Sequence, residues 1–380
     1  MASPAPVRDL ARAAADPSPA ATSPDARRQR VTSDPYLETL DHEELLVRRG
    51  RRSGLFTIVA IHSMVRGPAL GGCRMWRYED SRAALRDALR LSRAMTYKAA
   101  VADLPLGGGK GVIAIPAKSR LSGQRRRAAL LDFADTVQAL GGHYITAEDV
   151  GTSIRDMNVI ATRTGNVAGR GRSHGGSGDP SSFTALGVES AIRACCERVF
   201  SSGSLIGRTI SVIGLGHVGS RLAKRCARAG AKLLLADVDL AKRSLADQLD
   251  CRWTTPEQAL EAEVDVLAPC ALGGFLDEDV VPRLRCAVIA GAANNQLAHD
   301  RIADLLATRG VLWAPDFVVN AGGLINIAEE LGDYHPASAR RRVRGIADTL
   351  ETILAGAEAP GVTTLTAAME LARRRLAVAH

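Results

Sequence analysis

The 380-residue sequence lacks several features that mark large classes of proteins. Aromatic residues make up only 4% of it, which argues against a surface on which nucleic-acid bases stack. It has no uncharged apolar run of about 18 residues and no export signal with an apolar core. We therefore expect neither membrane insertion nor export.

The seven cysteines have none of the spacings that are typical of zinc ligands. Cys195 and Cys196 are adjacent, and the others stand apart along the chain. Free, buried thiols in a reducing compartment fit this pattern. We therefore expect a cytoplasmic protein without a metal site.

The formal net charge of +8 is spread along the chain rather than concentrated. The densest basic runs, residues 125–127 and 340–342, lie in helical or linker sequence. A solvated surface explains them better than a nucleic-acid binding patch does.

The order of the apolar segments predicts an α/β protein of two domains. Residues 1–34 have no periodic apolar positions, so we expect a disordered tail there. Glycines between residues 165 and 182 indicate a junction that serves as a hinge. The predicted parts are a first α/β domain over 35–178, a Rossmann-like doubly wound domain over 179–335, and a helical segment over 336–380.

Two lysines of the first domain are separated by a run of glycines. Lys98 lies at the end of an amphipathic helix predicted over residues 82–97, where it would also complement the helix dipole. Glycines 107–109 permit positive φ angles and a close approach of substrate, and Lys110 precedes an apolar strand. A nucleotide-triphosphate loop is excluded, because Leu104 and Gly111 stand where it needs Gly and Ser or Thr.

Two other stretches of this domain follow predicted strands. Gly71 and Gly72 come after the apolar run 55–61 and expose bare backbone to a ligand, or form a plain turn. Asp149 ends a short strand, where acids are well placed for catalysis. Its alternative role is to cap the helix that begins near Ile154.

The second domain contains a dinucleotide-binding fingerprint in its required context. A strand over 209–213 leads into a glycine turn, a helix and a second strand that ends at Asp237. The carboxylate of Asp237 would bind ribose hydroxyls and favours NAD over NADP, although Arg243 leaves NADP open. The turn consists of Gly214, Leu215, Gly216, His217, Val218 and Gly219.

Three more strand-like runs, 264–268, 286–290 and 311–314, end in turns of small or polar residues. The carboxyl ends of parallel strands meet at one edge of a sheet, so these turns predict one ligand crevice. The candidate cofactor-binding residues in them are Cys270, Ala271, Ala292 and Asn294.

Seven stretches, in consistent order over residues 35–375, resemble the Glu/Leu/Phe/Val dehydrogenase family. They are GPALGGCRMW, MTYKAAVADLPLGGGKGVIAIP, YITAEDVG, VIGLGHVG, APCALGG, GAANNQL and APDFVVNAGGLINIAEE. The resemblance is greatest to leucine, valine and phenylalanine dehydrogenases. It implies a homo-oligomer assembled through the first domain, which catalyses reversible, NAD-dependent oxidative deamination of an L-amino acid to a 2-oxo acid and ammonia.

The resemblance also implies roles for individual residues. Lys98 would bind the substrate carboxylate, and Lys110 and Asp149 would carry out the proton chemistry. The further positions implied to lie against the substrate or the nicotinamide are Gly71, Gly72, Thr184 and Asn294.

The pocket for the substrate side chain is implied to be apolar. A second carboxylate would be unpaired there, so glutamate is excluded. Ala147 is typical of the leucine enzymes, so we predict a branched-chain substrate, with phenylalanine as the alternative. One methylene changes the discrimination by only about 1–3 kcal/mol, so a broad specificity is expected. The implied walls are Leu70, Ala147, Leu324 and Ile327.

Two other functions are weighed against this one. A non-catalytic NAD-binding regulator would keep the glycine turn but would not need Lys98, Lys110 and Asp149. A hydroxy-acid dehydrogenase would share the cofactor domain, yet normally relies on a His and Arg pair.

Overall fold

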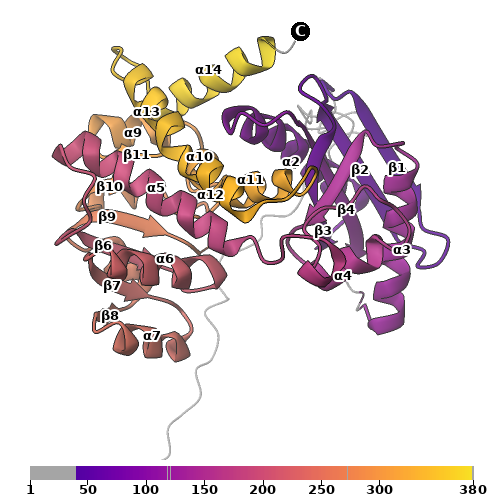
Figure 1. The fold of residues 1–380 in the computed structure, drawn as a ribbon, viewed down its shortest axis with the longest axis horizontal. Helices are drawn as coiled ribbons and strands as arrows, with labels where there is room; N and C mark the ends of the chain where they lie inside the picture. The colour runs from indigo at the N-terminus through magenta and orange to yellow at the C-terminus, as the bar shows by residue number, and fades with distance from the viewer. Residues whose placement is uncertain (1–39, 118, 120, 272, 379–380) are drawn as a thin grey trace, which may run out of the picture. The chain divides into compact units, whose positions relative to one another are not determined.

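The computed structural model describes residues 40–117, 119, 121–271 and 273–378 (Figure 1). The tail predicted over residues 1–34 lies outside the described residues. The strands form two sheets, with the orders β1-β2-β4-β3-β5 and β11-β10-β9-β6-β7-β8. These two sheets, followed by C-terminal helices, confirm the predicted fold class.

The first sheet is mixed. Strand β2 pairs antiparallel with β1 and β4, whereas β3 pairs parallel with β4 and β5. Because β4, β3 and β5 run in the same direction, residues near their carboxyl ends lie together. The strands are β1 (Glu44–Arg49), β2 (Phe56–Ser63), β3 (Ala69–Tyr78), β4 (Gly107–Pro116) and β5 (Tyr144–Glu148).

Three helices accompany this sheet, and two begin with clear capping contacts. Asp80 accepts a hydrogen bond of 2.7 Å from the Ala83 amide at the start of α2, and Ser153 forms a capping box with Asp156 at α4. Phe133 of α3 packs into a core with Val59 and Ile113. The helices are α2 (Ser81–Val101), α3 (Gly123–Gln138) and α4 (Ile154–Ile160).

The second sheet is parallel throughout. Its strand order reverses between β6 and β9, and in such folds ligands bind where the order reverses. The strands are β6 (Thr209–Ile213), β7 (Lys232–Ala236), β8 (Arg252–Thr254), β9 (Val264–Pro269), β10 (Cys286–Ile289) and β11 (Leu312–Trp313). The helices are α5 (Ser181–Phe200), α6 (His217–Arg228), α7 (Arg243–Gln248), α8 (Pro256–Leu260) and α9 (Ile302–Thr308), with short 3₁₀ turns η2 (Arg172–His174), η3 (Leu240–Lys242) and η4 (Val281–Arg283).

The last of the C-terminal helices, α14, packs against α2, one of the helices that accompany the first sheet. Arg375 of α14 donates a 2.5 Å hydrogen bond to the Val101 carbonyl at the end of α2, and α14 shares an apolar cluster with α2. No helix in the described ranges is long and apolar enough to cross a bilayer. The helices are α10 (Asp316–Val319), α11 (Gly322–Glu329), α12 (Pro336–Arg344), α13 (Ile346–Gly356) and α14 (Thr364–Ala377).

The prediction that the glycine run has positive φ angles is wrong. Glycines 107–109 do not have positive φ angles but lie within strand β4. They are needed because neighbours pack against them, since a Cβ on Gly108 would lie 2.0 Å from the backbone nitrogen of Thr96 in α2. The stretch with Gly71 and Gly72 is likewise a strand, β3, and not a turn.

Replacing Gly108 with alanine is therefore expected to destabilise the protein by about 1–3 kcal/mol, the usual cost of overpacking. Gly123→Ala is the matched control, because a Cβ there meets nothing within 4 Å and Gly123 begins α3. The free energy of unfolding, measured by urea denaturation, should fall for the first variant only. Equal stabilities of the two variants would contradict the packing argument.

Candidate functional site

A cavity of about 730 Å³ is lined by residues from the first sheet and its helices and by residues from the helices and turns of the second sheet. Its walls include the strand end after β5, the start of α5, the first residues of α6 and the helix α11. Of the residues predicted from the sequence, those that line it are Lys98, Asp149, Thr184, His217, Val218, Ala292, Asn294, Leu324 and Ile327.

Lys110 and Asp149 form an ion pair beside this cavity. The Lys110 Nζ lies 2.9 Å from Asp149 Oδ2, and Lys110 is only 5% exposed. Gly72 makes room for the pair, because a Cβ on Gly72 would lie 2.6 Å from the Asp149 Cβ. Ser153 caps helix α4, so the alternative capping role for Asp149 is wrong.

A second cation that the sequence analysis did not identify also binds Asp149. The Nε of Arg74, on strand β3, donates a 2.9 Å hydrogen bond to Asp149 Oδ2. Burial alone would raise the pKa of Asp149, but the charges of Lys110 and Arg74 outweigh it and lower the pKa below its usual value. Asp149 is therefore an ionised carboxylate between two cations. The only signal for Arg74 was its place in the stretch after Gly72.

Lys98 lies in the last turn of α2 and faces a row of amides. Its Nζ donates a 2.5 Å hydrogen bond to Asn320 Oδ1, and Asn320 Nδ2 donates a 2.7 Å bond to Asn294 Oδ1. Burial, assisted by the nearby charge of Lys110, lowers the pKa of Lys98 to about 8, although Asp316 opposes the shift. Asn320 was not among the predicted site residues, although its turn was expected at the crevice.

The glycine turn before α6 has the form that a dinucleotide requires. Gly214 has a φ of +93°, and a Cβ on Gly219 would lie 1.9 Å from the Gly214 carbonyl oxygen. A Cβ on Gly216 would meet no atom within 4 Å, and no side chain caps the helix there. A pyrophosphate therefore fits at this helix N-terminus.

Other predicted cofactor residues surround the same turn. The Asp237 carboxylate accepts a 2.5 Å hydrogen bond from the Leu215 amide, so the residue that follows strand β7 holds the turn in place. The Cβ of Ala271 lies 2.7 Å from the position of a Cβ on Gly214, and the neighbouring Cys270 amide donates to the Ile213 carbonyl at 2.7 Å. These residues border the turn without lining the cavity.

The predicted apolar walls divide into two pairs. Leu324 and Ile327, on α11, line the cavity, whereas Leu70 and Ala147 are buried in β3 and β5 and belong to the same apolar cluster. The Ala147 Cβ and the Ile327 Cδ1 both lie within 4.0 Å of a Cβ placed on Gly169, so Gly169 lies beside both side chains. Gly71 lies in β3, where a Cβ would lie 1.7 Å from the Gly109 carbonyl oxygen.

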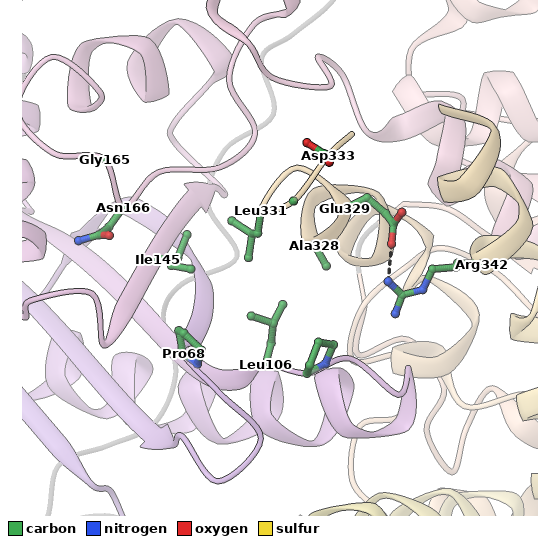
Figure 2. A pocket seen from close by; sticks show the side chains of 12 residues that line it. Pro68, Leu106, Ile145, Gly165, Asn166, Ala328, Glu329, Leu331, Asp333 and Arg342 are labelled. Carbon is green, nitrogen blue, oxygen red and sulfur yellow. Dashed lines mark hydrogen bonds and ion pairs between the residues drawn. The ribbon is translucent and has the colours of Figure 1, made fainter. Parts of the chain in front are cut away.

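A second cavity, of about 660 Å³, is lined by neither of the two lysines nor by Asp149 (Figure 2). Leu106, Ile145 and Leu331 give it an apolar lining, and Glu329 forms an ion pair with Arg342 at its edge. None of the predicted site residues line it. Within the described ranges, no cluster of three or more His, Cys, Asp or Glu side chains could hold a metal ion.

The position of Lys98 predicts an unusually reactive amine. Its neutral form should appear as the pH rises through about 8, rather than through the ordinary lysine value of 10.5. Carbamylation by cyanate, followed by mass spectrometry as a function of pH, measures this midpoint. Exposed Lys224 reports the effective reagent concentration in the same sample. A Lys98 midpoint near 10.5 would contradict the described environment.

Comparison with known proteins gives matches over most of the chain. Residues 44–166 match the dimerisation domain of the Glu/Leu/Phe/Val dehydrogenases, and residues 235–380 match the glutamate/leucine/phenylalanine/valine dehydrogenase model. Residues 191–271, which include the glycine turn, match the NAD binding domain of D-isomer specific 2-hydroxyacid dehydrogenases.

Individual relatives have different substrates in their names. Leucine dehydrogenase of Bacillus cereus is 41% identical, with 90% of this chain and 93% of the relative covered. Valine dehydrogenase of Streptomyces virginiae is also 41% identical, over 89% and 95%. The crystal structure of L-tryptophan dehydrogenase from Nostoc punctiforme has a TM-score of 0.79 and 36% identity, covering 91% of this chain and 98% of that one.

Proposed function

The chain belongs to the Glu/Leu/Phe/Val dehydrogenase family, and on that premise we propose that it oxidatively deaminates branched-chain L-amino acids with NAD. As a member of this family it is an amino acid dehydrogenase, an oxidoreductase that acts on CH–NH2 donors. The finer proposal, the reversible conversion of leucine or valine to a 2-oxo acid and ammonia, rests chiefly on one observation. Lys98, the Lys110–Asp149 pair and the glycine turn all lie in or beside one cavity.

Lys98 binds the substrate carboxylate in this proposal. Its Nζ donates a hydrogen bond of 2.5 Å to the neutral amide oxygen of Asn320. A carboxylate that replaces this oxygen adds a charge-assisted hydrogen bond in a poorly solvated place. Burial lowers the pKa of Lys98 and so favours its neutral form. A bound carboxylate opposes this effect, because a nearby negative charge favours the protonated lysine.

Lys110 and Asp149 move the protons. The Gly214 to Gly219 turn would hold NAD, which would supply the acceptor for the hydride of the substrate Cα and so leave the substrate as an iminium. Lys110 acts as the base once it has passed its own proton to solvent, and its neutral Nζ then takes a proton from the water that attacks the iminium carbon. The ionised Asp149 carboxylate accepts that proton from Lys110 and passes it to the amino nitrogen, and ammonia leaves as the C–N bond breaks. Thr184 and Asn294, which line the same cavity, are proposed to contact the nicotinamide or the substrate.

The apolar lining of the side-chain pocket determines which substrates we expect. Its proposed walls, Leu70, Ala147, Leu324 and Ile327, have no polar group that would pair with a glutamate carboxylate. Leucine and valine fit these aliphatic walls. An aromatic substrate is the alternative, favoured by the likeness to an L-tryptophan dehydrogenase.

NAD rather than NADP, a homo-oligomer and a cytoplasmic location complete the proposal. The Asp237 carboxylate beside the glycine turn would repel a 2′-phosphate. The match to a dimerisation domain over residues 44–166 supports assembly through the first sheet. All seven cysteines are free, which fits a reducing compartment.

The proposal is tested by following NADH formation from NAD with L-leucine, L-valine, L-isoleucine, L-phenylalanine, L-tryptophan and L-glutamate. We expect the highest kcat/KM with a branched-chain substrate, none with glutamate, and poorer rates when NADP replaces NAD. A preference for tryptophan or phenylalanine would contradict the pocket assignment. No turnover with any of them, by protein that binds NAD, would favour a non-catalytic regulator.

Lys110→Met and Asp149→Asn are each expected to lower kcat by about 10²- to 10⁴-fold, the usual contribution of one acid–base group. Neither residue touches the glycine turn, so the dissociation constant for NAD should stay unchanged. Steady-state rates and NAD titrations on the same preparations make this comparison. A variant that binds NAD and keeps most of its kcat would remove its residue from the mechanism.

A further inference from the structure

Arg74 links Asp149 to a second carboxylate on another element. Its Nε donates to Asp149 Oδ2 at 2.9 Å, and its Nη1 donates to Asp87 Oδ2 at 3.0 Å. The Arg74 side chain is 20% exposed, so solvent screens these contacts only partly. Asp87 belongs to helix α2, which also carries Lys98.

Asp87 is itself held from two sides. The Tyr78 hydroxyl donates to Asp87 Oδ2 at 2.7 Å, and Arg90 Nη2 lies 2.9 Å from Asp87 Oδ1. Burial raises the pKa of Tyr78, so its hydroxyl keeps the proton that it donates. Lys110, Asp149, Arg74 and Asp87 thus form a row of alternating charges that runs from the cavity to α2.

We propose that Arg74 is a positioning residue for amino acid oxidation, which fixes the Asp149 carboxylate beside Lys110 and is itself held by Asp87. This inference rests on the proposed function, because it assigns a task to the partner of Asp149. Arg74 and Lys110 both make their close contact with Oδ2. The other oxygen, Oδ1, is left as the one that exchanges a proton with the substrate.

Arginine is required at this position by geometry. Two different nitrogens of one planar guanidinium bind the two carboxylates, and a lysine has a single nitrogen for both. A lysine therefore keeps the positive charge but loses one of the two links. Comparing Arg74→Lys with Arg74→Met separates the charge from the orientation.

Charge also determines the pH at which Asp149 ionises. Lys110 from β4 and Arg74 from β3 lower its pKa, against burial. The other titratable groups that interact with it are Cys73, Tyr78, Lys98 and Tyr144. Because Asp149 has a lowered pKa, loss of the Arg74 charge raises that pKa. The acid limb of the pH profile then moves to higher pH.

The experiment measures kcat, KM and the pH dependence of kcat/KM for wild type, Arg74→Met, Arg74→Lys and Arg90→Met. Arg90→Met is the matched control, since Arg90 contacts Asp87 but not Asp149. We expect Arg74→Met to lose about 10²-fold in kcat, as for a misplaced catalytic group, with a shifted acid limb. Arg74→Lys should lose less, with its acid limb unmoved, and Arg90→Met should stay within about twofold of wild type.

A folded Arg74→Met with the rate and the acid limb of Arg90→Met would overturn the proposal. If Arg74→Met does not fold, Asp87→Asn decides, because it removes the anchor of Arg74 and keeps the Arg74 charge. It should lower kcat by about tenfold without moving the acid limb upward, and a rate equal to that of Arg90→Met would overturn the proposal. Absence of turnover in the wild type would instead refute the proposed function.

Discussion

The pairing of Lys110 with Asp149 is the interaction on which the rest of the site depends. A lysine that is 5% exposed has lost most of its hydration, and an unpaired cation there would lose its proton or disrupt the fold. Asp149 provides the opposite charge, and Arg74 compensates for the burial of Asp149 itself. Lys98, whose Nζ donates to the neutral amide oxygen of Asn320, is then the cation in the cavity that suits a substrate with a carboxylate.

This arrangement constrains the backbone around it. Asp149 reaches the lysine because Gly72 has no side chain, and β3 lies close to β4 because Gly71 has none. Gly108 in turn lets α2 approach β4 closely, and α2 carries both Lys98 and Asp87. The glycines of this region are thus needed for packing between elements that each hold a charged group.

Much of the site was predictable, because its signals are local. The glycine turn before α6 and the two lysines could be assigned from their neighbours in sequence, and the fold class followed from the order of apolar segments. The conformation of glycines 107–109 was not predictable, since it depends on Ser63 and Thr96, which are distant in sequence. Arg74 was missed for the same reason, because its partners Asp87 and Asp149 meet it only in the folded protein.

The most direct test of the account is a crystal structure of the protein with NAD and 4-methyl-2-oxopentanoate, the 2-oxo acid of leucine. The account predicts the carboxylate of this ligand within about 3 Å of Lys98 Nζ. Its carbonyl carbon should lie between the Lys110–Asp149 pair and the nicotinamide, with the isobutyl group against Leu324 and Ile327. A ligand bound instead in the cavity of Leu106, Ile145 and Leu331, or with its carboxylate away from Lys98, would contradict it.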